Sequence, residues 1–160
     1  MALPPFQRLV DDHWREVARL ARALAGAVDG DDVAQQAWTQ AYAAYPSLRS
    51  AANLRGWLLT ITHRCAMDVH RSRSRRAVPT DDDTVLERST GLVAGPEEQL
   101  GDDALWSQVA RLPARQREAV VLKYVGELDH PTIAELLGTT PTMSRRLVSD
   151  GLKTLRASTS

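Results

Sequence analysis

The sequence predicts an all-α protein made of two small helical modules joined by an acidic flexible linker. Apolar residues recur at about the 3.6-residue period of an amphipathic helix on both sides of the chain's centre. No stretch of useful length alternates apolar and polar residues as a half-buried strand does. Residues 77–104 are rich in proline, glycine and carboxylates, a composition too polar to form a core. The predicted modules are therefore residues 1–76 and 105–160.

Three helices are predicted in the first module. The apolar stripe is interrupted by a turn signal at Asp29-Gly30 and again at Pro46, because proline lacks the backbone donor that a continuing helix needs. The predicted helices cover residues 6–28, 31–45 and 51–70, and the third ends in a run of arginines and serines.

Four helices are predicted in the second module. Pro113 interrupts the first apolar stripe, and the segment Gly138 to Pro141 interrupts a later one. The predicted helices begin near residues 103, 114, 131 and 141, and the last runs through Leu155.

Residues 131–147 have the pattern of a helix-turn-helix. The small Ala134 allows two helices to approach, Gly138 permits a turn with positive φ, and hydroxyl residues that can cap a helix follow. An αα-hairpin with solvated arginines is the alternative. In a DNA-binding helix-turn-helix, the second helix places its first side chains in the major groove, here Thr142, Met143, Ser144, Arg145 and Arg146.

Charge is distributed unevenly along the chain. Basic and acidic residues are equal at 20 each, yet residues 31–76 hold seven basic and three acidic side chains. Residues 77–104 hold one basic and eight acidic side chains, and residues 105–160 hold eight basic and five acidic ones. This pattern indicates two anion-binding surfaces joined by a segment that would repel DNA or imitate it.

The segment before the helix-turn-helix gives the first family resemblance. Residues 112–124 read LPARQREAVVLKY, which resembles the LPxRQRE opening of region 4 in bacterial sigma factors. The resemblance implies that Arg115 and the five residues 142–146 contact the −35 promoter element, and that this module meets the β flap of RNA polymerase. An ungapped match buries Ser144 and Val148, whereas a shift of one residue buries Met143 and Leu147.

The second predicted helix carries another resemblance. Residues 31–38 read DDVAQQAW, similar to the D-x-x-Q-E-x-(F/W) signature of sigma region 2, with Gln36 in place of the usual glutamate. The resemblance implies that Asp31, Asp32, Gln35 and Gln36 grip the β′ coiled coil of RNA polymerase. The alternative is an ordinary helix start, with one aspartate capping exposed N–H groups.

The third predicted helix resembles the stretch of region 2 that opens and reads the −10 element. Residues 53–71 read NLRGWLLTITHRCAMDVHR, against FxxWLxxIxRNxxxDxxR, and Arg64 replaces the usual asparagine. One face is apolar while arginines lie along another, suited to phosphate. The residues implied for the −10 element are Asn53, Arg55, Trp57, Thr60, Arg64 and Arg71. Some of the arginines in 71–76 are alternatively a solvated basic tail.

Taken together, the chain resembles an extracytoplasmic-function (ECF) sigma factor of the sigma-70 family. Its implied partners are the RNA polymerase core, promoter DNA and an anti-sigma factor. No catalytic, metal-binding or cofactor-binding motif is recognisable, and no stretch approaches a membrane span, so a cytoplasmic non-enzymatic protein is expected. Two alternatives remain. One is a two-module helix-turn-helix regulator, and the other is a degenerate sigma-like protein that binds polymerase or an anti-sigma factor without starting transcription.

Overall fold

A computed structural model describes residues 3–76 and 103–159, and both ranges are helical without a strand. The all-α prediction is confirmed. Most of the predicted linker lies outside the described residues. The N-terminal module contains α1 (Phe6–Ala44), the 3₁₀ turn η1 (Tyr45–Ser47) and α2 (Leu54–Arg76). The C-terminal module contains α4 (Asp103–Ala110), α5 (Ala114–Tyr124), α6 (His130–Leu137) and α7 (Pro141–Thr159).

The first two predicted helices form one kinked element, α1. Its backbone leaves helical geometry at Gly26, where φ is 92° and ψ is 169°. Glycine adopts this conformation because it has no Cβ to clash with the backbone. The break predicted at Asp29-Gly30 is therefore wrong, and with it the alternative that an aspartate at 31 or 32 caps a helix start. Asp29 instead lies within the helix and pairs with Arg73 of α2 at 2.9 Å.

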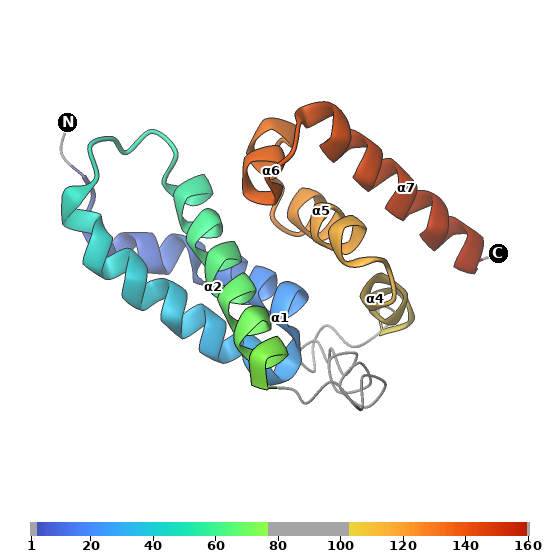
Figure 1. The fold of residues 1–160 in the computed structure, drawn as a ribbon. Coiled ribbons are helices and arrows are strands. Elements are labelled where there is room, and N and C mark those ends of the chain that lie inside the picture. Colours follow the sequence, from blue (N-terminus) through green and yellow to red (C-terminus); the bar gives the residue numbers. More distant parts are fainter. Residues whose placement is uncertain (1–2, 77–102, 160) are drawn as a thin grey trace.

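The core of the N-terminal module lies where α2 packs along α1 (Figure 1). Leu20 and Val33 from the two halves of α1 are buried with Leu58 and Leu59 of α2. Near the start of α1, the ring of Phe6 makes edge contacts with three further rings, Trp38, Tyr42 and Tyr45. These contacts hold the N-terminus of α1 against its C-terminal half.

Helix α2 starts close to the predicted position and ends later than predicted. The side-chain oxygen of Asn53 accepts a hydrogen bond from the Gly56 backbone N–H at 3.1 Å, which satisfies a donor in the first turn. The helix then continues through Arg76. The prediction that helical structure gives way within the arginine run is wrong, and Arg73 within this run pairs with Asp29 of α1, whose side chain is only 16% exposed.

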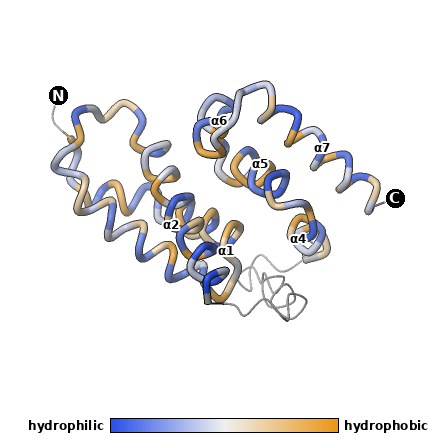
Figure 2. Tube along the Cα trace, in the orientation of Figure 1, coloured by the Kyte–Doolittle hydropathy of each residue, from blue (hydrophilic) through white to orange (hydrophobic). Residues whose placement is uncertain are grey.

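The C-terminal module surrounds α5, which packs against α6 and α7 (Figure 1). Ala119, Val120, Val121 and Leu122 of α5 are buried. Helix α5 ends at Tyr124, although its apolar stripe predicts a continuation to Leu128. Figure 2 shows hydrophilic and hydrophobic stretches alternating along the helices, as expected when each helix has one buried side.

The two modules touch through α1 and α5. The faces of α2 and α6 border a cavity of about 290 Å³, whose lining side chains are Thr60, His63, Arg64, Met67, Arg71, Thr132, Glu135 and Leu136. Within the parts of the chain that the structure describes, no helix is long and apolar enough to cross a membrane.

Candidate functional site

The four residues predicted to grip polymerase lie together on the second half of α1. Asp31, Asp32, Gln35 and Gln36 are all exposed, while Val33 and Ala37 in the same stretch of helix are buried in the core. Asp31 pairs with Arg22 at 3.2 Å. The core contacts of α1 therefore fix its rotation so that Asp32, Gln35 and Gln36 face outward. Their i, i+3 and i+4 spacing places them on one face of the helix.

The helix-turn-helix is present with the predicted turn. Gly138 ends α6 in the left-handed region, with φ of 66° and ψ of 40°, and its N–H bonds to carbonyls of the last turn. The Asp129 carboxylate caps the start of α6 by accepting a hydrogen bond from the Thr132 N–H at 3.0 Å. The Thr140 hydroxyl accepts one from the Met143 N–H at 3.1 Å, which caps the start of α7. Both helices thus have defined starts.

The structure selects one register for α7. Ser144 and Val148 are buried, while Met143 is 40% exposed. The ungapped match is therefore correct, and the assignment of Ser144 to base contacts is wrong, because its side chain has no exposed surface. The buried hydroxyl is bonded to His130 Nδ1 at 2.9 Å instead.

Four predicted −35 residues remain at the exposed start of α7: Thr142, Met143, Arg145 and Arg146. The Arg145 guanidinium lies 3.4 Å from the Thr142 hydroxyl, and Arg146 lies 3.8 Å from Asp150, a pair exposed enough to contribute little to stability. Arg115 donates to the Leu137 carbonyl oxygen at 2.9 Å, near the turn of the helix-turn-helix.

The predicted −10 residues do not share a single surface. Arg64 and Arg71 are exposed and, with Thr60, line the cavity facing α6. Trp57 is half-buried and packs at 6.1 Å from the Tyr45 ring, so it acts mainly in the core. Asn53 is exposed, although its side chain caps α2.

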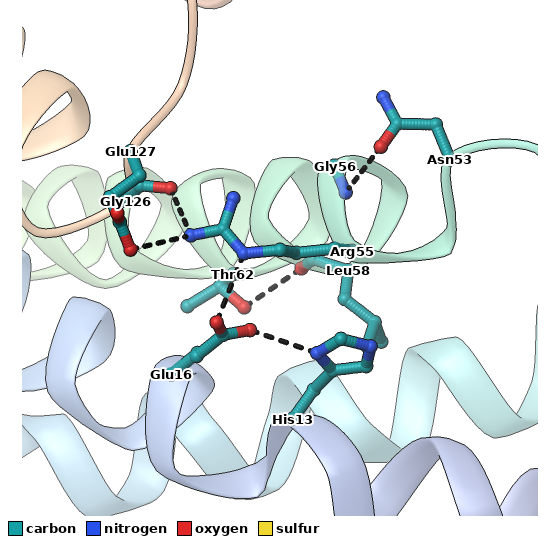
Figure 3. A network of polar contacts seen from close by, with 9 residues as sticks. All are labelled: His13, Glu16, Asn53, Arg55, Gly56, Leu58, Thr62, Gly126 and Glu127. Atoms are coloured by element: carbon teal, nitrogen blue, oxygen red, sulfur yellow. Dashed lines mark hydrogen bonds and ion pairs between the residues drawn. The ribbon is translucent and has the colours of Figure 1, made fainter.

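Arg55 lies at the contact between the modules (Figure 3). Its Nε donates to Glu16 of α1 at 3.0 Å, and its Nη2 donates to the Gly126 carbonyl oxygen. The same nitrogen lies 3.6 Å from the Glu127 carboxylate in the turn after α5. Burial by itself would raise the pKa of Glu16, but hydrogen bonds from His13 and Arg55 outweigh burial and lower it.

A second polar contact between the modules is buried more deeply. His63 of α2 is 4% exposed, and its Nε2 lies 3.3 Å from the Glu118 carboxylate of α5. This contact joins α2 directly to α5.

Sequence reasoning missed the residues that join segments far apart in the chain. Glu16, Glu118 and Glu127 read as ordinary surface carboxylates, and no spacing pattern connects them with α2. His130 belongs to no recognisable metal-binding motif, and no spacing pattern in the sequence pairs it with Ser144.

Two family models match the chain. The model described as Sigma-70 region 2 matches residues 9–76, and the model described as Sigma-70, region 4 matches residues 102–155. Each coincides with one of the two helical modules.

Curated relatives agree with these matches. RNA polymerase sigma factor SigV of Bacillus subtilis is 28% identical over 86% of this chain and 81% of that protein. ECF RNA polymerase sigma factor SigK of Mycolicibacterium vanbaalenii is 32% identical over 78% of this chain and 64% of that protein.

Solved structures share the fold. The sigma factor RpoE, solved with the anti-sigma factor NepR from Bartonella quintana, superposes with a TM-score of 0.80 at 22% identity, covering 95% of this chain and 94% of that one. CnrH, solved with the cytosolic domain of CnrY, superposes with a TM-score of 0.66 at 22% identity, covering 95% of this chain and 85% of that one. Two matching region models, relatives of one kind and a shared fold show that the chain belongs to the sigma-70 family, as an ECF sigma factor.

Proposed function

We propose that this chain binds the core of RNA polymerase in the cytoplasm and directs initiation at specific promoters. In this proposal, region 2 recognises and melts the −10 element and region 4 reads the −35 element. The observation that carries it is the exposed group Asp31, Asp32, Gln35 and Gln36 on the same chain as a capped helix-turn-helix. A regulator that uses only the helix-turn-helix has no need of this exposed polar group on α1.

The polar group on α1 is suited to a partner protein. Within the described residues, the side chains of Asp32, Gln35 and Gln36 have no polar contact of their own, so their hydrogen-bonding groups are available. The buried side chains of Val33 and Ala37, on the opposite side of α1, keep this face outward. We assign the β′ coiled coil of polymerase as its partner, and the β flap as the partner of region 4.

The start of α7 is suited to DNA. Arg145 and Arg146 supply positive charge, and the exposed Met143 supplies an apolar surface of the kind that contacts thymine methyl groups. Arg64 and Arg71 on α2 supply a second group of cations for the −10 region. Zero net charge gives the free chain little attraction to DNA, so we expect tight promoter binding only after core binding.

Binding to core polymerase, the first part of the proposed function, is tested by titrating the labelled full chain with purified core. We expect Asp32→Ala to weaken core binding roughly tenfold through loss of a charge-assisted hydrogen bond. Asp12→Ala is the matched control, since Asp12 is an exposed aspartate in the first half of α1. Equal core affinity for all three proteins would contradict the assignment, and no core binding at all would favour a simple helix-turn-helix regulator.

Promoter recognition, the second part of the proposed function, is tested by measuring promoter binding of the complex between this chain and core polymerase. Arg145→Ala should keep core binding and lose affinity for promoters, whereas Lys153→Ala, which removes an exposed cation about 12 Å further along α7, should change neither. Core binding without promoter selection by the unmodified chain would favour a degenerate sigma-like protein.

We also propose an anti-sigma factor as a partner. The sigma factor RpoE was solved with the anti-sigma factor NepR, and CnrH with the cytosolic domain of CnrY. In this chain the two modules border a cavity of about 290 Å³ between α2 and α6. An anti-sigma protein seated there should be released by Leu136→Asp and retained by Asp12→Ala. The bound anti-sigma protein should also prevent this chain from binding core polymerase. A partner that binds this chain together with core would overturn the proposal of an anti-sigma factor.

A further inference from the structure

A buried hydroxyl joins the two helices of the helix-turn-helix. Ser144 is fully buried on α7, and its Oγ lies 2.9 Å from Nδ1 of His130, the first residue of α6. Of the buried polar side chains in residues 3–76 and 103–159, Thr62 bonds within its own helix and His63 reaches α5. Ser144 alone among them bonds between α6 and α7.

Ser144 lies in the same turn as the side chains available to DNA. Met143 and Arg145, its neighbours on either side, are exposed. Successive residues of a helix are separated by about 100° around its axis. A contact that fixes Ser144 against α6 therefore fixes the direction in which the two exposed side chains point.

We propose that His130 and Ser144 form a positioning pair that sets the rotation of α7 and so determines which bases region 4 prefers. This inference rests on the proposed function, because it concerns how the same helix meets the −35 element. A hydrogen bond can do this where apolar packing would not, since a small rotation leaves a buried hydroxyl without its partner.

The surroundings of His130 favour the neutral imidazole. Burial, together with the positive charges of Lys123 on α5 and Arg145 on α7, lowers the pKa of His130, and only the Asp129 carboxylate at the start of α6 acts in the opposite direction. In the neutral tautomer with an open Nδ1, the Ser144 hydroxyl donates to that nitrogen. Protonation at Nδ1 reverses the donor and leaves the hydroxyl proton without its acceptor.

The experiment selects promoters from a library randomised at the −35 element, with the full chain and purified core. We expect Ser144→Ala and His130→Ala to lose roughly tenfold in discrimination at one or two positions, with core affinity unchanged. Ser149→Ala, at an exposed serine of α7, is the matched control and should select the wild-type sequence.

Two further readouts separate positioning from simple stability. His130→Asn, whose amide oxygen can lie where Nδ1 lies, should restore selection, whereas His130→Gln, whose amide reaches the Nε2 position, should not. Because the pKa of His130 is lowered, selectivity of the wild-type chain should hold at neutral pH and fall only below the ordinary histidine pKa, and that of His130→Asn should stay constant. Circular dichroism should show the same helix content throughout.

The outcomes distinguish this inference from the function on which it rests. If wild type selects a −35 sequence and Ser144→Ala selects the same one with equal discrimination, the positioning role is overturned and the proposed function stands. The positioning role is likewise overturned if His130→Asn and His130→Gln select the same promoters with equal discrimination. If wild type selects no sequence, the proposed function fails and the inference fails with it.

Discussion

The Arg55 guanidinium of α2 lies 3.6 Å from the Glu127 carboxylate, which belongs to the turn between α5 and α6. Arg55 also donates to the Gly126 carbonyl oxygen, so a residue assigned by resemblance to the −10 element joins the two modules. These contacts occupy the Nε and Nη2 nitrogens of the guanidinium.

Arg55→Ala should loosen the contact between the modules. The substitution removes the contacts to Glu16, Gly126 and Glu127 together, and small-angle X-ray scattering of the full chain should then show a larger radius of gyration. Helix content by circular dichroism should not change.

Glu127→Gln should have a smaller effect than Arg55→Ala, because the Glu127 side chain is 76% exposed and such ion pairs contribute about 0–1 kcal/mol. Arg19→Ala, at an exposed arginine of α1, is the control for loss of one positive charge. Scattering from Arg55→Ala that coincides with scattering from Arg19→Ala would contradict the role of this contact.

The contact between the buried His63 and the partly buried Glu118 should contribute to stability. Removing one partner of a buried hydrogen bond leaves the other unsatisfied, so Glu118→Ala should lower the free energy of unfolding by about 1–3 kcal/mol. Glu118→Gln retains an acceptor and should lose less. Urea unfolding measures both, and equal losses for the two variants would show that packing rather than the hydrogen bond is responsible.

Glu16 should make stability depend on acid pH. Although burial raises the pKa of Glu16, the hydrogen bonds from His13 and Arg55 leave it below its ordinary value. A lowered carboxyl pKa stabilises the native state above the ordinary value of about 4.3, and this contribution is lost as the pH falls through the lowered pKa. The difference in unfolding free energy between wild type and Glu16→Gln should therefore be largest near neutral pH and shrink in acid. A difference independent of pH would contradict the ion-pair explanation.

The two glycines with positive φ should differ in their tolerance of alanine. A Cβ on Gly138 meets nothing within 4 Å, so Gly138→Ala should cost only the left-handed strain of about 1–2 kcal/mol, and Gly138→Asn less. Gly26 has φ of 92° with ψ of 169°, a combination essentially restricted to glycine, so Gly26→Ala should cost about 1–3 kcal/mol. Urea unfolding of the three variants checks the order, and a Gly26→Ala protein as stable as wild type would contradict it.

Local pattern predicted the helices well. Helical periodicity, Pro113 and the Gly138 turn located α5, α6 and α7 within a few residues, because these signals act through neighbouring backbone groups. The kink in α1 was misplaced for the same reason. Asp29-Gly30 is a strong local turn signal, yet the chain bends at Gly26, and α1 packs along α2.

Contacts between distant segments could not be predicted. The burial of Ser144 depends on which of two registers α7 adopts against α6, and the motif match allowed both. The position of Arg55 between Glu16 and Glu127 joins three segments that no spacing rule relates. The resemblance supplied candidate residues, and the fold separated those that face outward from those that hold the modules together.

Run-off transcription with purified core polymerase tests the central claim most directly. Core alone should give little product from a linear promoter library, and addition of this chain should give discrete transcripts from a subset that shares −35 and −10 sequences. Those transcripts should be lost with Asp32→Ala through loss of core binding, and with Arg145→Ala while core binding is retained. Core binding without any promoter-specific transcript, under conditions where a known sigma factor is active with the same core, would contradict the claim.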